Sequence, residues 1–285
     1  MNQPPVYPPA SFGSSPSGPT PPPGSGRKPL SFWLALFFGG CTLLGGILVL
    51  VLSLGLVSMQ GLAAGASSPA YQERVVEGSG RDKIAWIPVH GVIMEIEEGG
   101  PFSPPDPVQK VLNSLRQARE DADVKAVVLD VDSPGGGVTA SDKIHHAVLQ
   151  TREAGKSVVV LMGDVAASGG YYVSAPADRI LAHPTTVTGS IGVIAQLLNV
   201  EGLVQKIGVK TETFKSGLHK DLGSMTRPMT LEERAIFQAL IDEMYGKFVG
   251  IVYDGRKGVT LPDGSAFTQE HLLRVADGRI YTAAQ

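Results

Sequence analysis

Cysteine is almost absent from this sequence of 285 residues, and Cys41 is its single example. One cysteine excludes an internal disulfide framework and a thiolate metal site, and its place in an apolar run argues against a cysteine nucleophile. The His-Glu-x-x-His motif of zinc hydrolases is missing as well. The Gly/Lys/Ser spacing of a P-loop and the glycine fingerprint of dinucleotide-binding folds are also absent, so nucleotide binding has no support.

Charge is scarce at the N-terminal end. Arg27 and Lys28 are the only charged side chains in residues 1–60, and the net charge is −3. Nucleic-acid binding would need a basic stripe, which is missing, so we expect no nucleic-acid partner. Residues 1–29 are rich in Pro, Ser and Gly and bury too little apolar surface to fold, which predicts a disordered tail. A Pro-rich docking motif is the alternative for this tail.

Residues 30–59 are predicted to form one transmembrane helix. No charged residue occurs from Ser31 to Met59, and about 20 apolar residues suffice to cross a bilayer. The basic pair before this run predicts a cytoplasmic N-terminus and an extracytoplasmic main domain. A cleaved signal peptide is the competing interpretation, because Ala64-Gly65-Ala66 resembles a cleavage site, but the apolar run is about twice the expected length. Residues 60–80 are then a linker and residues 81–285 the main domain.

From residue 83 onward, short strands alternate with helices. The apolar patterns predict strands at 84–89, 91–96, 124–131, 158–162, 179–182 and 211–214, and helices at 108–120, 139–153, 203–207 and 230–253. The run 124–131 is continuously apolar, which is typical of a strand buried on both faces. Thr230 and Glu233 have the spacing of a capping box. This order predicts an α/β fold with parallel strands and crossover helices.

Two glycine-rich turns follow neighbouring predicted strands. Gly135-Gly136-Gly137 follows one, and Ala167-Ser168-Gly169-Gly170 follows the next, before a helix from about Tyr171. A serine between small residues has an uncovered hydroxyl, and glycine permits close backbone approach. Backbone N–H groups at such turns suit a developing oxyanion. The pattern therefore favours an acyl-transfer site, although close packing alone would also explain small residues here.

The sequence leaves the base for Ser168 open. His183 or His219 could complete a triad with Asp178 or Asp221, since triads are defined by geometry and not by order. A lysine also serves where desolvation lowers its pKa from about 10.4 towards neutrality. Lys215 and Lys220, after the predicted strand 211–214, are the candidates.

Four motifs then resemble the signal peptide peptidase A family of bacterial membrane-anchored serine peptidases, and the resemblance runs from about residue 83 to the end. They are Asp132-Ser133-Pro134-Gly135-Gly136, Ala167-Ser168-Gly169-Gly170-Tyr171-Tyr172, Thr188-Gly189-Ser190-Ile191-Gly192 and Lys215-Ser216-Gly217-Leu218-His219-Lys220-Asp221. The resemblance implies a ClpP/crotonase-like α/β fold and a Ser-Lys dyad without metal or organic cofactor.

The resemblance also implies a role for each matching residue. Ser168 would be the nucleophile and Lys220, not Lys215, the general base. Ser190 would orient the Lys220 amine, and the N–H groups of Gly135 and Gly169 would form the oxyanion hole. The implied substrates are membrane-associated peptides such as cleaved signal peptides. A homo-oligomer is expected, and in one arrangement Lys220 of one subunit acts in the active site of its neighbour.

Two other functions share parts of this pattern. A crotonase-like acyl-CoA enzyme would have paired oxyanion turns but no need for the Ser168 and Lys220 pair, and a catalytically inactive membrane scaffold would need neither. The family pattern after Asp277-Gly278-Arg279-Ile280-Tyr281-Thr282 normally continues through another helix and strand, whereas this chain ends at Gln285. We therefore expect either that a terminal element is missing or that the sequence is truncated.

Overall fold

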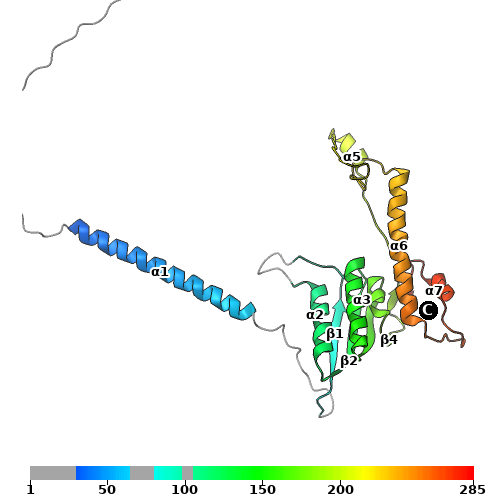
Figure 1. Cartoon of the computed structure of the whole chain (residues 1–285). Coiled ribbons are helices and arrows are strands. Elements are labelled where there is room, and N and C mark those ends of the chain that lie inside the picture. The colour runs from blue at the N-terminus through cyan, green and yellow to red at the C-terminus, as the bar shows by residue number, and fades with distance from the viewer. Residues whose placement is uncertain (1–29, 65–79, 98–104) are drawn as a thin grey trace, which may run out of the picture. The chain divides into compact units, whose positions relative to one another are not determined.

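The computed structural model describes residues 30–64, 80–97 and 105–285, which belong to two units divided between Glu73 and Arg74. In the first unit, helix α1 (Leu30–Ala64) covers the predicted membrane segment 30–59 (Figure 1). In the ranges that the structure describes, no helix combines the length and apolar character needed to cross a membrane, so the transmembrane helix stays a prediction. The predicted disordered tail and most of the predicted linker lie outside the described residues.

The second unit is built on a mainly parallel sheet, which confirms the α/β class. Among the described residues the sheet has six strands, in the order β1-β2-β3-β5-β6, with β4 also paired to β3. The strands are β1 (Lys83–His90), β2 (Val124–Ser133), β3 (Ser157–Ala167), β4 (Arg179–Ala182), β5 (Val187–Gly189) and β6 (Ile280–Thr282). All pairs are parallel except β5 with β6.

Strand β3 holds the sheet together because it has two partners on one side. Its first half pairs with β4, from Val159 opposite Arg179, and its last residues pair with β5, ending at Ala167 opposite Gly189. Its other side pairs with β2, as far as Ser133 opposite Ala166. The residue after β3 therefore lies at the end of three neighbouring strands.

The crossover helices form where the sequence predicts them. They are α2 (Pro107–Glu120) and α3 (Val138–Glu153), and Figure 1 shows them side by side beside β1 and β2. Helix α2 begins at Asp106, whose side chain accepts the Val108 N–H, and Pro107 needs no acceptor at the first helical position. Leu115 from α2, Ile144 from α3 and Leu129 from β2 are almost fully buried in one core.

Three expectations for the strands are wrong. In β2 the buried residues alternate with half-buried ones, so only one face of this strand is fully covered. Residues 91–96 form no strand and contribute only an isolated bridge from Ile93 to Gly136. Residues 211–214 form no strand either, since no neighbouring segment of the described chain pairs with them, and Phe214 is 94% exposed.

The C-terminal part consists of α6 (Leu231–Arg256), α7 (Gln269–Val275) and β6. The capping box at the start of α6 is confirmed: the Thr230 hydroxyl accepts the Glu233 N–H, and the Glu233 carboxylate accepts the Thr230 N–H. The short helices α4 (Gly169–Ser174) and α5 (Glu201–Lys206) complete the unit. Phe248 and Val252 of α6 pack with Tyr172 of α4 in a second core cluster.

Candidate active site

Ser168 lies at the abrupt turn between β3 and α4. Its φ of 52° is in the left-handed region, which a non-glycine residue adopts only at a cost. Two hydrogen bonds hold it there: its N–H donates to Gly189 O at 2.9 Å, and its carbonyl accepts the Tyr172 N–H at 2.9 Å. The residue is half-buried, and within the described chain no hydrogen bond occupies its hydroxyl. A strained strand-to-helix turn with an available hydroxyl is the usual setting of a serine nucleophile.

The glycine turn after β2 packs directly against this serine. A Cβ on Gly135 would lie 2.8 Å from the Ser168 Cβ and 2.5 Å from the Gly169 nitrogen, and its φ is 98°. A Cβ on Gly136 would lie 2.1 Å from the Ile93 carbonyl oxygen. Glycine is thus required at both positions, and the structure brings the two turns together as the sequence suggests.

The backbone donors around this contact differ in whether they have an acceptor. The Gly135 N–H donates to the Ser133 hydroxyl at 3.1 Å, and that hydroxyl donates to Gly91 O at 2.6 Å. Gly169 is the first residue of α4, so its N–H has no acceptor within the helix. The Gly136 nitrogen lies 3.1 Å from where a Gly169 Cβ would be. Gly136 is therefore a further donor candidate that sequence reasoning missed, although it lies in the same glycine run.

Ser190 takes the equivalent place on the neighbouring strand. Ala167 pairs with Gly189, so Ser168 and Ser190 each come one residue after paired positions of adjacent parallel strands. Adjacent strands lie about 4.8 Å apart, which makes the two serines neighbours. Ser190 also has a positive φ, 51°, and its N–H donates to Arg279 O at 2.8 Å. Among the described residues, these two serines are the only non-glycine residues with positive φ.

Lys220 belongs to a different part of the unit. It lies in a turn within residues 194–230, which connect β5 with α6 and carry α5; we call this segment the arm. Figure 1 shows α5 beyond the N-terminal end of α6, away from the sheet. Lys220 is exposed, and no hydrogen bond or ion pair joins its amine to Ser168 or Ser190. One chain thus groups Ser168, Ser190 and the glycines without bringing the lysine to them.

Comparison with known proteins matches residues 150–285 to the family described as peptidase family S49. A putative protease of Synechocystis is 38% identical over 73% of this chain and 67% of its own length. The chain belongs to peptidase family S49. A putative signal peptide peptidase SppA of Enterococcus faecium is 37% identical over 77% of this chain, which spans 61% of that relative. The chloroplastic serine protease SPPA of Arabidopsis thaliana is 34% identical over 71% of this chain and 29% of its own length.

Among solved structures, a ClpP1 mutant of Listeria monocytogenes aligns with 70% of this S49 chain and 82% of its own, at 14% identity and a TM-score of 0.42.

The histidine triads considered from the sequence find no support in this S49 chain. Asp178 accepts the Val158 N–H at the start of β3, whereas Ser168 follows the far end of that strand. His219 is 3.4 Å from Glu232 and is not joined to Asp221 by a hydrogen bond. His183 is exposed, and among the described contacts its ring has no partner. Lys215 donates to Asp221 at 2.7 Å, so this lysine is already engaged.

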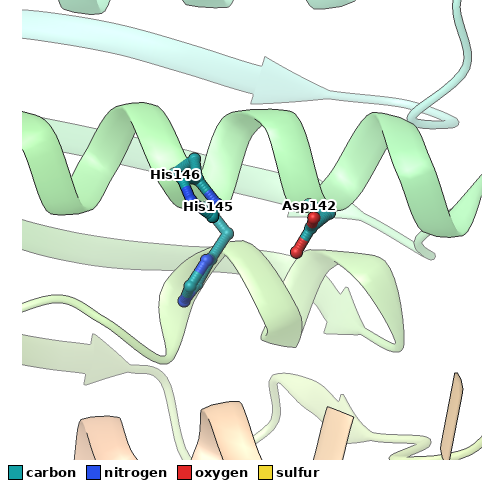
Figure 2. A group of neighbouring side chains, drawn as sticks. All are labelled: Asp142, His145 and His146. Carbon is teal, nitrogen blue, oxygen red and sulfur yellow. The ribbon is translucent and has the colours of Figure 1, made fainter. Parts of the chain in front are cut away.

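A cluster on α3 offers ligand types for a metal, as Figure 2 shows. Asp142, His145 and His146 each place one ligand atom within 4.8 Å of the others. However, the Asp142 carboxylate accepts the Tyr172 hydroxyl at 2.6 Å and the Lys247 ammonium at 2.8 Å. A cation would have to compete with that ammonium. The contacts favour a packing cluster that joins α3, α4 and α6.

His145 is the buried member of this cluster. Its ring packs edge-on against Tyr172, with centroids 5.4 Å apart, and its Nδ1 is buried with no partner among the described residues. Burial lowers the pKa of His145 to about 4, which the nearby Asp142 charge only partly offsets. The ring is therefore neutral at pH 7 and contributes packing without charge.

Proposed function

We propose that this S49 chain is a serine endopeptidase that cleaves membrane-associated peptides, with released signal peptides as the substrate class. Ser168 is the nucleophile, and Lys220 is the general base and acid. The observation that carries the proposal is the Ser168 turn, where a strained serine with an available hydroxyl contacts the glycine turn that ends the neighbouring strand. Membership of a peptidase family and the names of the relatives support the substrate class.

We infer that Lys220 reaches the Ser168 of a second copy of the chain. Within one chain the lysine lies on the arm and the serine at the end of the sheet. The arm also exposes apolar side chains that would ordinarily be buried: Ile194, Leu198, Leu203, Ile207, Phe214 and Leu218. Such a surface, next to a residue that one copy cannot use, suits contact with another copy of the same chain. The active enzyme is then a homo-oligomer with sites shared between neighbours.

The chemical steps follow from this arrangement. Neutral Lys220 of one copy takes the Ser168 proton of the next, and the alkoxide attacks the peptide carbonyl. Backbone N–H groups of Gly135 and Gly169, with that of Gly136 beside them, stabilise the oxyanion. For Gly135 this requires its N–H to leave the Ser133 hydroxyl. Ser190 follows the strand next to the one that ends before Ser168. Its hydroxyl donates a hydrogen bond to the neutral Lys220 amine, or accepts one from the protonated amine, and so orients it.

Acylation and deacylation complete the reaction. The protonated amine gives its proton to the leaving peptide nitrogen as the C–N bond breaks, and Ser168 carries the acyl group. Water then attacks the ester as Lys220 takes its proton, the acyl C–O bond breaks, and Lys220 returns the proton to the Ser168 oxygen while the acid product leaves. None of these steps needs a metal or an organic cofactor. The membrane anchor predicted from residues 30–59 would hold the enzyme where such peptides lie, and carbonate extraction of membranes tests it.

The test of the shared site is complementation between inactive variants. With the full chain and an Ala-rich fluorogenic peptide, Ser168→Ala and Lys220→Ala are each expected to be inactive. Their mixture should recover about a quarter of wild-type activity, because random assembly pairs an intact serine with an intact lysine at one site in four.

Full activity of either single variant would overturn the proposed dyad. Two inactive variants whose mixture also stays inactive would instead show that each chain uses its own lysine. Labelling of Ser168 by a fluorophosphonate, located by peptide mass, checks the nucleophile independently. Acyl-CoA turnover in place of peptide hydrolysis would favour the crotonase-like alternative.

A further inference from the structure

The residue after Lys220 in the chain is a carboxylate that two cations hold. The Lys215 ammonium is 2.7 Å from Asp221 Oδ1, and the Arg227 Nε is 2.9 Å from Asp221 Oδ2. Both oxygens of Asp221 are therefore engaged, and this side chain is only 15% exposed. Hydrogen bonds from Arg227 and then Lys215 hold the pKa of Asp221 well below its usual range, so it stays charged.

Arg227 also connects this turn to the start of α6. Its Nη1 donates to Glu233 Oε2 at 2.8 Å, and its Nη2 donates to Glu233 Oε1. Glu233 has a side chain only 3% exposed and forms the capping box of α6 with Thr230. The Arg227 Nη2 reaches the Asp221 carbonyl oxygen as well, at 3.2 Å. One guanidinium thus ties both the side chain and the backbone of Asp221 to a helix of 26 residues.

This arrangement matters for a lysine that must act as a base. A free carboxylate beside an ammonium stabilises the protonated form, and a protonated lysine cannot take the serine proton. Asp221 adjoins Lys220 in the chain, but its oxygens are occupied by Lys215 and Arg227. The other charged pair facing this turn is His219 with Glu232 of α6, at 3.4 Å. The amine of Lys220 itself has no polar partner within the described chain.

We propose that Arg227 is a positioning residue for the general base: it fixes the Lys220 turn against α6 and withholds the Asp221 carboxylate from the Lys220 amine. This inference rests on the proposed function, because it assigns Arg227 a role only if Lys220 is the base. It also gives the Lys220 turn a fixed attachment to α6, although the arm buries no large apolar side chain among the described residues.

The first test is the pH–rate profile of Arg227→Gln in the full chain. Loss of the guanidinium frees Asp221 Oδ2, the oxygen that Lys215 does not hold, to pair with Lys220, so kcat at neutral pH should fall about tenfold or more. The acidic limb of the profile should move to higher pH by about 1 unit. The double variant Arg227→Gln/Asp221→Asn should return this limb to its wild-type position, because the competing carboxylate is gone. Arg234→Gln, which removes an exposed arginine of α6, is the matched control and should change neither quantity.

A wild-type pH profile in Arg227→Gln would overturn the inference, as would a shift that Asp221→Asn fails to reverse. If Arg227→Gln does not fold, Arg227→Lys replaces it. A lysine keeps the positive charge but lacks the planar guanidinium that binds Asp221 and Glu233 together. We therefore expect the acidic limb to shift in the same direction by a smaller amount.

Mixing of variants separates this inference from the proposed function. Arg227→Gln mixed with Ser168→Ala should recover activity, because the Ser168→Ala copy supplies an intact Lys220 turn to the intact serine. Arg227→Gln mixed with Lys220→Ala should gain no activity, because the only copies that carry Lys220 lack the Arg227 that positions it. Equal recovery in both mixtures would overturn the role of Arg227 while leaving the dyad intact. No recovery from Ser168→Ala with Lys220→Ala would instead count against the shared site itself.

Discussion

The sheet region and the arm of the second unit are stabilised in opposite ways. From β1 to β5, the sheet and its helices enclose a core of buried apolar side chains, with Leu115, Leu129 and Val148 at 0% exposure. The arm, residues 194–230, contributes no large apolar side chain to either buried cluster. Phe214 and Ile194 are 94% and 79% exposed. The arm owes its conformation to ionic and backbone hydrogen bonds, such as those of Arg227.

This difference indicates how the proposed catalytic groups are divided between the sheet region and the arm. The sheet region fixes groups that need sub-ångström placement, because three strands end around Ser168 and its neighbours. The arm carries Lys220, the proposed base, on a surface that also exposes apolar side chains such as Phe214 and Leu218. On the proposed function, a site split in this way would be active only when the arm of one copy is held by another. The following predictions probe each side of the division, from the largest effect to the smallest.

The strongest test places charges on the apolar surface of the arm. Leu203→Asp/Phe214→Asp should abolish association and reduce peptidase activity by about 10³-fold or more, because the general base no longer reaches a serine. Both side chains are exposed in one chain, so the melting temperature of the sheet region should hardly change. Sedimentation and peptide hydrolysis measure the two effects. Leu273→Asp on α7, 49% exposed, is the control that should leave both unchanged. If the double variant is monomeric and still active, the proposed division of the site between two copies is wrong.

Gly135→Ala tests whether the reaction depends on the close packing between the two glycine turns of the sheet region. The new Cβ would lie 2.5 Å from the Gly169 nitrogen and 2.8 Å from the Ser168 Cβ, so the two turns must separate. Displacing an oxyanion donor costs about 10²-fold in kcat. Gly137→Ala is the matched control, because its Cβ would come no closer than 3.7 Å to any neighbour and it keeps full activity. Equal activity of the two variants would show that the contact has no part in catalysis.

Leu129→Ala compares the two regions by stability. Leu129 is fully buried in the sheet core, and a buried Leu→Ala change lowers the free energy of unfolding by about 2–5 kcal/mol. Phe214→Ala, in the arm, should lower it by less than about 0.5 kcal/mol at concentrations where the chain is monomeric. Urea unfolding gives both values. A large loss from Phe214→Ala in the monomer would mean that the arm is packed within its own chain.

The smallest effect concerns His145, between α3 and α4. Its pKa is about 4 in the folded chain against 6.5 for an ordinary histidine. Between these values the unfolded chain binds the extra proton, so stability is complete above pH 6.5 and falls as the pH decreases towards 4. The loss should be on the order of 2 kcal/mol, measured by unfolding at pH 7 and pH 4.5. His145→Gln should flatten this dependence, whereas His146→Gln, which is exposed, should not.

Much of the fold could be predicted because its signals are local. Apart from the strand expected at 91–96, the strand and helix order from residue 83 to 182 follows from periodicity and glycine turns, and the capping box of Thr230 and Glu233 marks the start of α6. The strand expected at 211–214 was wrong because β-branched composition does not supply a pairing partner. Helix α7 and strand β6 are too short to give a clear pattern.

The candidate site, like the fold, could be predicted only in part from the sequence. The Ser168 turn could be identified from small residues after an apolar run, and the roles of Lys220 and Ser190 came from a family resemblance. The pairing of Arg227 with Asp221 and Glu233 gave no signal, because charged residues six positions apart in a loop have no fixed spacing. Gly136 was not named as a donor, because the glycine run alone does not show that the Gly135 N–H is bonded to the Ser133 hydroxyl.

By itself, the sequence determined most of the order of strands and helices from β1 to β4, the two glycine turns and the serine between small residues, since each depends on side chains within one turn or strand of each other. Only the tertiary structure decided that Ser190 adjoins Ser168, that Gly135 packs against Ser168 and Gly169, and that Lys220 lies on a separate arm. These relations join residues more than twenty positions apart. They depend on which strands pair and on which surfaces stay uncovered, which no local pattern encodes.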